Sequence, residues 1–203
     1  MLENLVGADV TVCADEGQGI PENYRRGWQA FDWNADWHLV MEDDLLLPRG
    51  FQQSVIGAIE RAPEPLAPIS FFAIAPRYRT AFNDGYSWYV DNGTNTSCAL
   101  AVPKLIVEEF LAWEEVHVAP EHRWFCQRLT SFCQTFDVPV QYTLPCLVDH
   151  LGDESLTGNP KLAGGVYPRI ASAFVDPAPP PEYWDGPAFR KNNHAPKPPE
   201  SLR

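Results

Sequence analysis

Short apolar stretches alternate along this chain with stretches of helical periodicity, and this alternation constrains the fold more than any other feature of the sequence. Residues 37–44 (WHLVMEDD) and 68–75 (PISFFAIA) are short and apolar, as strands covered on both faces are. Between them, Phe51, Val55 and Ile59 recur on one helical face. A β-α-β order of this kind predicts an α/β fold with a largely parallel sheet flanked by helices.

The remaining elements follow from the same patterns. Residues 8–17 (ADVTVCADEG) alternate like a strand that runs into a loop, and Tyr24, Trp28 and Phe31 mark an apolar helix face within residues 21–33. Residues 76–95 have no period and predict a long loop. Further strands are expected at 96–103 and 138–150, and further helices at 104–117 and 120–136.

The C-terminal region has a different composition. From Pro177 onward, eight of the 27 residues are proline. We therefore expect one domain over residues 1–158 and an extended, proline-rich tail over residues 159–203.

The charge and cysteine content restrict the function and location. With 15 basic and 27 acidic residues the net charge is -12, which disfavours a broad nucleic-acid-binding surface. No apolar run reaches the roughly 18 residues of a membrane span, and the first ten residues lack the features of a signal peptide. The five cysteines are scattered, which favours reduced, buried thiols and a cytoplasmic protein.

Three consecutive carboxylates, Glu42, Asp43 and Asp44, follow a predicted strand. In open α/β sheets, ligands bind beyond the carboxyl ends of the strands. Strand alternation places Glu42 and Asp44 on one side, an arrangement that suits a hard divalent cation such as Mg²⁺ or Mn²⁺. The alternative is a solvated acidic cap at the end of the strand.

A second polar site follows the strand predicted to end at His150. Neutral imidazole is a common metal ligand, so His150 could be a third ligand beside the acidic triplet. Alternatively, it is a loop histidine bonded to a backbone carbonyl. Ser155, a few residues later, has a hydroxyl able to contact an anion.

Three segments together resemble the GT-A glycosyltransferases, in particular their small family-25-like and phage-encoded members. "LVMEDDLLLPRGF" is similar to their DXD-type motif, "LPCLVDHLGDES" to their late histidine segment, and "VTVCADEG" with "NYRRGWQAF" to their second nucleotide-binding strand and its helix. The resemblance covers roughly residues 9–158. GT-A domains normally begin with a further strand and helix, whereas only "LENLVGA" separates Met1 from Asp9.

The resemblance implies a role for each matching residue. Asp44 would be the principal metal ligand, Glu42 would contact the donor ribose or a metal-bound water, and His150 would complete coordination or contact the diphosphate. Asp15 would lie near the base of the donor nucleotide, and Arg25 or Arg26 would face its diphosphate. The expected donor-binding residues are thus Asp15, Arg25, Arg26, Glu42, Asp43 and Ser155, with Asp44 and His150 as metal ligands.

An inverting enzyme also needs a carboxylate that accepts the proton of the acceptor hydroxyl. Glu121 and Asp91 are the expected candidates for this base, and Glu114, Glu115 and Asp84 are alternatives to them. Glu121 has a structural alternative, because it follows Pro120 in the first turn of a predicted helix, where the helix dipole favours a negative charge.

These expectations combine into one functional hypothesis. The chain would be a metal-dependent glycosyltransferase that uses Mn²⁺ or Mg²⁺ to move a sugar from a nucleotide-diphosphate sugar to a hydroxyl acceptor. The acceptor would be a glycan or a hydroxymethylated base of phage DNA. The alternatives are a metal-dependent phosphoester hydrolase and a glycosyltransferase-like binding module without turnover.

Overall fold

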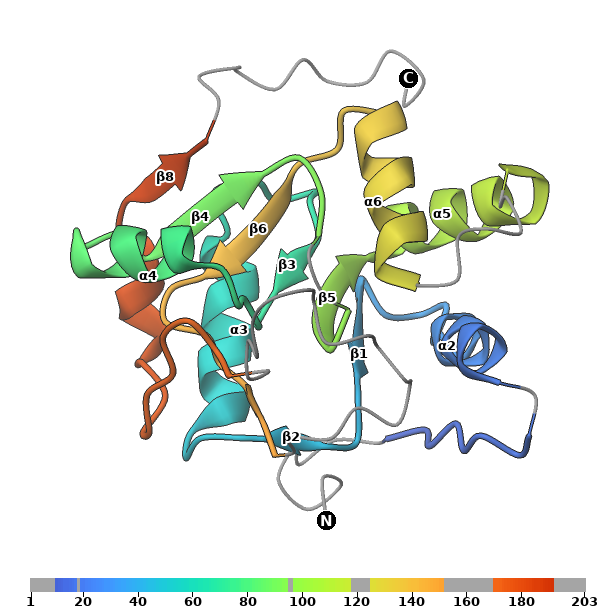
Figure 1. Ribbon diagram of the computed structural model, residues 1–203, viewed down its shortest axis with the longest axis horizontal. Coiled ribbons are helices and arrows are strands. Elements are labelled where there is room, and N and C mark those ends of the chain that lie inside the picture. Colours follow the sequence, from blue (N-terminus) through green and yellow to red (C-terminus); the bar gives the residue numbers. More distant parts are fainter. Residues whose placement is uncertain (1–9, 18, 95–96, 118–124, 152–169, 192–203) are drawn as a thin grey trace, which may run out of the picture.

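A six-stranded sheet with helices on both faces organises the chain (Figure 1). The computed structural model describes residues 10–17, 19–94, 97–117, 125–151 and 170–191. The helices are α2 (Ile20–Gln29), α3 (Phe51–Arg61), α4 (Pro76–Asn83), α5 (Lys104–His117), α6 (Phe125–Thr135) and the 3-10 helix η1 (Pro181–Asp185). The strands are β1 (Trp37–Met41), β2 (Leu45–Leu46), β3 (Ile69–Ser70), β4 (Trp88–Asp91), β5 (Ala99–Pro103), β6 (Val140–Thr143), β7 (Asp149–His150) and β8 (Ala188–Arg190).

The strand directions in the main sheet are mixed. Its order is β1-β5-β3-β6-β4-β8, with β3–β6 and β4–β8 parallel and the other three pairs antiparallel. The α/β class predicted from the sequence is therefore confirmed, but the largely parallel sheet is wrong. The reason lies in β5, which runs antiparallel to β1 and β3, and in β4, which runs antiparallel to β6.

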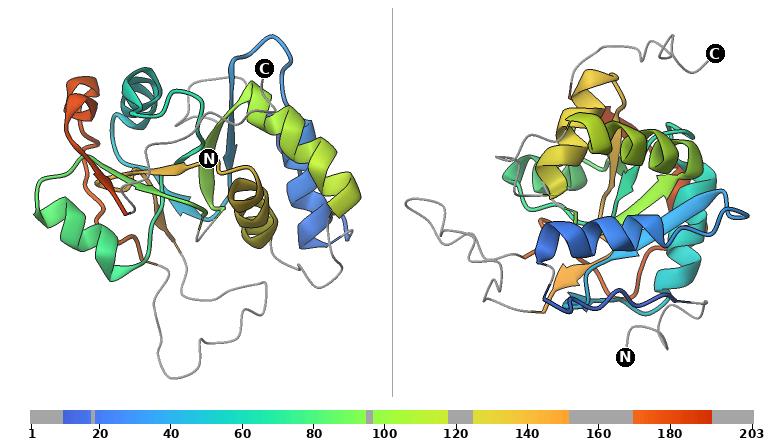
Figure 2. Two further views of the ribbon diagram at one scale, coloured as in Figure 1. Left: turned by 90° about the horizontal axis from the view of Figure 1, so that it is seen from above. Right: turned by 90° about the vertical axis from the view of Figure 1, so that its right-hand side faces the viewer.

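Helices cover the two faces of this sheet. Figure 2 shows α3 and η1 on one face and α4 and α6 on the other, with α2 and α5 beside β1. The tilted rings of Trp28 in α2 and Phe110 in α5 lie 4.8 Å apart between centroids. Both side chains are buried, so the apolar helix face predicted around Trp28 packs into the core.

Two predicted segments have a different structure. The loop predicted for residues 76–95 contains α4 and β4, because Pro76 opens a helix and Trp88 to Asp91 form a fully buried strand. The strand predicted for residues 8–17 is absent from its described part, residues 10–17. Val10 and Val12 in that segment are 41% and 67% exposed, so their alternation buries no face.

The C-terminal region belongs to the domain over residues 170–191, contrary to the expected extended tail. Strand β8 pairs in parallel with β4, and the side chain of Trp184 in η1 is buried. The indole N–H of Trp184 donates a hydrogen bond to Ser54 Oγ in α3 at 3.2 Å. Pro181 starts η1, and the buried side chain of Trp184 then anchors this segment to the core.

A second, two-stranded sheet lies at the edge of the molecule beside the end of β1 (Figure 1). In this sheet β2 and β7 run antiparallel, with Leu45 opposite His150 and Leu46 opposite Asp149. The pairing places the acidic triplet next to the late histidine segment. None of the helices in the described part of the chain is long and apolar enough to cross a membrane.

Candidate functional site

Three polar segments meet where β1 leaves the main sheet and β2 begins. The N–H of Glu42 donates a hydrogen bond to the carbonyl of Cys98 at 2.8 Å, which extends the β1–β5 pairing by one residue. The N–H of Leu151 donates to the carbonyl of Asp44 at 2.8 Å, which extends the β2–β7 pairing. Backbone pairing thus brings Glu42, Asp44, Cys98 and His150 to one place.

The imidazole of His150 lies between two carboxylates. Its Nε2 is 3.4 Å from Glu42 Oε2, and its Nδ1 is 3.4 Å from Asp44 Oδ2. The His150 side chain is only 2% exposed, and the ring of Phe72 lies 5.9 Å from it between centroids. The two residues that the sequence proposed as metal ligands, Asp44 and His150, are therefore neighbours in the folded chain.

Tyr24 holds the carboxylate of Glu42 from the side of α2. Its hydroxyl donates a hydrogen bond to Glu42 Oε1, which leaves Oε2 on the side of His150. The Tyr24 ring stacks on Phe125 at 5.2 Å. The sequence pattern predicts Tyr24 on an apolar helix face, and its aromatic ring does pack there. No local pattern in the sequence indicates the contact of its hydroxyl with Glu42.

Cys98, predicted from the sequence only as a buried thiol, is a further member of the cluster. It is 6% exposed, and its Sγ, a carboxylate oxygen of Glu42 and a ring nitrogen of His150 all lie within 4.8 Å of one another. Such a group can hold a metal ion. Only the antiparallel pairing of β5 with β1 reveals this proximity, because nothing near Cys98 in the sequence suggests a site.

Asp44 is the more exposed of the two carboxylates, with 46% of its side chain accessible. Burial nevertheless raises the pKa of its carboxyl; His150 lowers this pKa, and Glu42 and Asp43 raise it. The Oδ1 atom of Asp44 is buried, and no hydrogen-bond donor among the described residues reaches it. A bound cation would satisfy this oxygen and offset the repulsion from Glu42.

Asp15 and Arg25, which were expected to bind the donor, have other contacts. Asp15 accepts hydrogen bonds from the N–H groups of Gly17 and Gly19 at 2.9 and 3.3 Å, just before α2. Arg25 pairs with Glu115 of α5 at 2.9 Å.

Arg26 donates to the carbonyl of Ala14 at 3.1 Å, so it also has a structural partner near the start of α2. Asp43 is exposed in the turn between β1 and β2. Glu121 and Ser155, the expected base and anion contact, lie outside the described residues.

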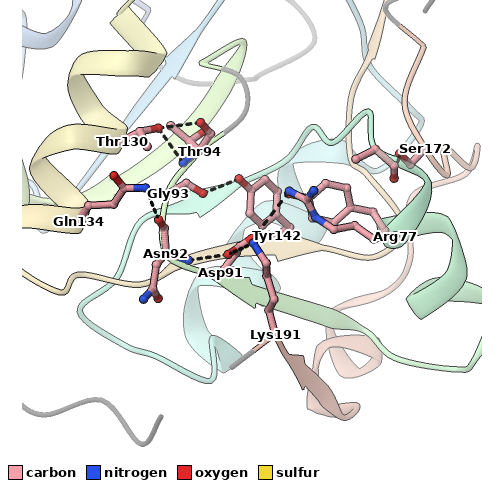
Figure 3. Close-up of polar contacts among 12 residues, drawn as sticks. Arg77, Asp91, Asn92, Gly93, Thr94, Thr130, Gln134, Tyr142, Ser172 and Lys191 are labelled. Atoms are coloured by element: carbon pink, nitrogen blue, oxygen red, sulfur yellow. Dashed lines mark hydrogen bonds and ion pairs between the residues drawn. The ribbon is translucent and has the colours of Figure 1, made fainter. Parts of the chain in front are cut away.

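Asp91, the other expected base, is not in this cluster. It ends β4, which runs in the opposite direction to β1 across the sheet. Asp91 and Glu42 therefore lie toward opposite ends of the strands. The strand register places Asp91 four strands across from Glu42 and four residues along, a separation of roughly 20 Å. Figure 3 shows Asp91 instead beside Lys191 and Arg77, which lie 3.0 and 3.4 Å from its carboxylate.

Comparisons with known proteins do not assign this site. No protein-family model matches the chain, and no curated protein matches it.

Proposed function

We propose that the chain is a metal-dependent glycosyltransferase that binds Mn²⁺ or Mg²⁺ and a nucleotide-diphosphate sugar at the Glu42–Asp44–His150 cluster. The single observation that carries the proposal is the proximity of Asp44 and His150, 3.4 Å apart although roughly half the chain separates them. Two motifs that resemble the same enzyme family on independent residues thereby share one site.

The residues at this site have the chemistry that the reaction needs. A divalent cation neutralises the negative charge that develops on the diphosphate leaving group. Glu42 and Asp44 supply carboxylate oxygens for it, and the buried His150 supplies an imidazole nitrogen. Tyr24 fixes the orientation of the Glu42 carboxylate through its hydroxyl.

The acceptor is a hydroxyl on a glycan or on a hydroxymethylated DNA base. The net charge of -12 favours the glycan, because a surface of this sign repels the DNA backbone outside a local contact. Mass spectrometry of oligosaccharides and of hydroxymethylated DNA after incubation with a donor separates the two acceptors.

Calorimetry with Mn²⁺ and a panel of nucleotide-diphosphate sugars tests the proposal. Binding of one donor only when Mn²⁺ is present is the expected result, and Asp44→Asn and His150→Ala should each weaken it at least about 10-fold. Glu60→Gln, on the exposed surface of α3, is the matched control and should bind the donor like the unmodified protein.

Three outcomes would reject the proposal. A folded protein that binds no nucleotide diphosphate in the presence of Mn²⁺ or Mg²⁺ is not a transferase of this kind. Release of a free sugar phosphate without any acceptor would instead indicate the phosphoester hydrolase. Metal-dependent donor binding without transfer in a broad acceptor screen would indicate the binding module.

A further inference from the structure

The proposed sugar transfer gives no role to the thiol of Cys98, although it lies inside the cluster. A thiol is a poor ligand for Mg²⁺ and a favoured one for zinc-like metals. With Glu42 and His150, the cluster offers one sulfur, one nitrogen and one oxygen ligand. This combination differs from the all-oxygen environment that Mg²⁺ prefers.

The spacing of these atoms fits a tetrahedral metal centre. Two oxygen or nitrogen ligands bonded to one zinc ion at about 2.0–2.2 Å lie roughly 3.4 Å apart when the angle between them is tetrahedral. His150 Nε2 and Glu42 Oε2 are 3.4 Å apart. The sulfur bond is longer, about 2.3 Å, and the three ligand atoms all lie within 4.8 Å of one another, so side-chain rotations would suffice to bring them onto one ion.

Two neighbouring residues would hold the ligands in place. Tyr24 donates a hydrogen bond to the oxygen of Glu42 that does not face His150. Asp44 lies beside Nδ1 of His150, the ring nitrogen away from Glu42. A carboxylate on the second nitrogen of a ligating histidine is the usual outer partner in zinc sites, where it fixes the ring orientation.

We propose that Glu42, Cys98 and His150 form a zinc-type site with three protein ligands and an open fourth position. In this site Asp44 is a positioning residue that orients His150 through Nδ1, whereas in the proposed sugar transfer Asp44 is itself a ligand of Mn²⁺ or Mg²⁺. The open position would take water or an oxygen of an anionic ligand. The proposal shares its residues with the proposed sugar transfer but does not depend on it, because metal binding is measured without a nucleotide sugar.

Cobalt substitution tests the role of the thiol directly. Co²⁺ replaces Zn²⁺ in such sites and shows a near-ultraviolet charge-transfer absorption only when a thiolate is bound. Titration of the metal-free protein with Co²⁺ should produce this absorption, and Zn²⁺ should abolish it. In Cys98→Ser the absorption should disappear, whereas Cys126→Ser, a half-buried thiol of α6, should retain it.

The affinity for Zn²⁺ gives a second measurement. Loss of an outer partner typically costs about 10–100-fold in metal affinity, so loss of the thiolate ligand should cost at least about 100-fold. Asp44→Asn should cost about 10–100-fold and retain the cobalt absorption. Absence of the absorption in the unmodified protein, or its persistence in Cys98→Ser, would overturn the proposal.

Alkylation of the unmodified protein covers the case in which Cys98→Ser does not fold. Bound Zn²⁺ should slow the alkylation of Cys98 at least about 10-fold and leave that of Cys126 unchanged. Equal rates with and without Zn²⁺ would contradict the site. The results also separate the two proposals. If the unmodified protein transfers sugar with Mn²⁺ but does not bind Zn²⁺ through Cys98, only the thiolate site is rejected. If it binds Zn²⁺ through Cys98 but transfers no sugar, only the sugar transfer is rejected.

Discussion

Asp44 is held in a position that disfavours its charged form. Burial raises the pKa of its carboxyl, and the nearby Glu42 adds repulsion. An acid whose pKa is raised on folding reduces stability at any pH above its folded pKa, and this cost vanishes below its ordinary pKa of 3.8. At neutral pH the metal-free protein therefore carries a cost at Asp44, as is common for groups that bind a ligand.

Asp44→Asn should accordingly stabilise the metal-free protein at pH 7. Solvent screens a side chain that is 46% exposed, so the expected rise in Tm is small, about 1–3 °C. Thermal unfolding in the presence of a chelator measures it, and the gain should shrink as the pH is lowered toward 4. A clear fall in Tm for this variant at pH 7 would mean that the carboxylate stabilises the fold.

Two buried thiols give the protein an alkaline limit. Burial raises the pKa of Cys133 to about 12 and that of Cys146 to about 11, from an ordinary value of 9.0. Above pH 9 the unfolded chain loses these protons while the folded chain keeps them, so stability falls as the pH rises.

From pH 8 to pH 10 the two thiols should together lower the free energy of unfolding by about 3 kcal/mol. Urea unfolding at both pH values measures this change. Cys133→Ala should lose about half of the dependence, and an identical slope in this variant would show that other groups cause it.

The residues of the cluster differ in how far the sequence predicts them. Glu42, Asp44 and His150 each follow an apolar stretch, so their place at a strand end was readable. Cys98 and Tyr24 enter the site through the β1–β5 pairing and through packing of α2. These contacts join segments that are distant in the sequence, so no local sequence pattern predicts them.

Among the elements, the periodic helices and most of the apolar strands were predictable. The strands predicted at 37–44, 68–75, 96–103 and 138–150 contain β1, β3, β5 and β6. The helices predicted around Phe51 and over residues 104–117 appear as α3 and α5. Strands β4 and β8 were missed because tertiary pairing, rather than local alternation, makes them strands. In β4 all four residues are buried, which removes the alternation that marks a strand.

The contact between α3 and η1 depends on a glycine. A Cβ atom at Gly57 of α3 would lie 2.6 Å from the Cα of Pro181 in η1, closer than backbone atoms tolerate. Gly57→Ala should therefore destabilise the protein by about 1–3 kcal/mol, although alanine favours a helix more than glycine. Gln53→Ala, on the exposed side of the same helix, should change stability by less than about 0.5 kcal/mol. Chemical denaturation compares the two, and equal effects would mean that η1 can shift away from α3.

For the molecule as a whole, the segment 170–191 closes the domain. Trp184 ties it to two elements: its indole N–H donates to Ser54 of α3, and its carbonyl accepts from the indole N–H of Trp88 in β4 at 2.9 Å. The composition of this region predicted an extended tail. Proline content describes the local backbone conformation but not whether an apolar anchor such as Trp184 finds a pocket in the core.

Trp184→Ala should therefore lower stability by about 3–5 kcal/mol, or roughly 10 °C in Tm. Trp33→Ala is the matched control, because Trp33 is 56% exposed and its loss should cost less than about 1 kcal/mol. Calorimetric unfolding of both variants provides the comparison. Similar Tm values for the two variants would mean that residues 170–191 contribute little to the cooperative unit.

The sheet formed by β2 and β7 consists of two residue pairs, and it joins the backbone of the acidic triplet to that of His150. So short a ladder, closed across roughly half of the chain, should open more often than the core strands and reach its final pairing late during folding. Amide hydrogen exchange at Leu151 would follow this opening. An ion bound by residues of both strands would slow that exchange, so the proposed metal would itself stabilise the strand pairing that forms its site.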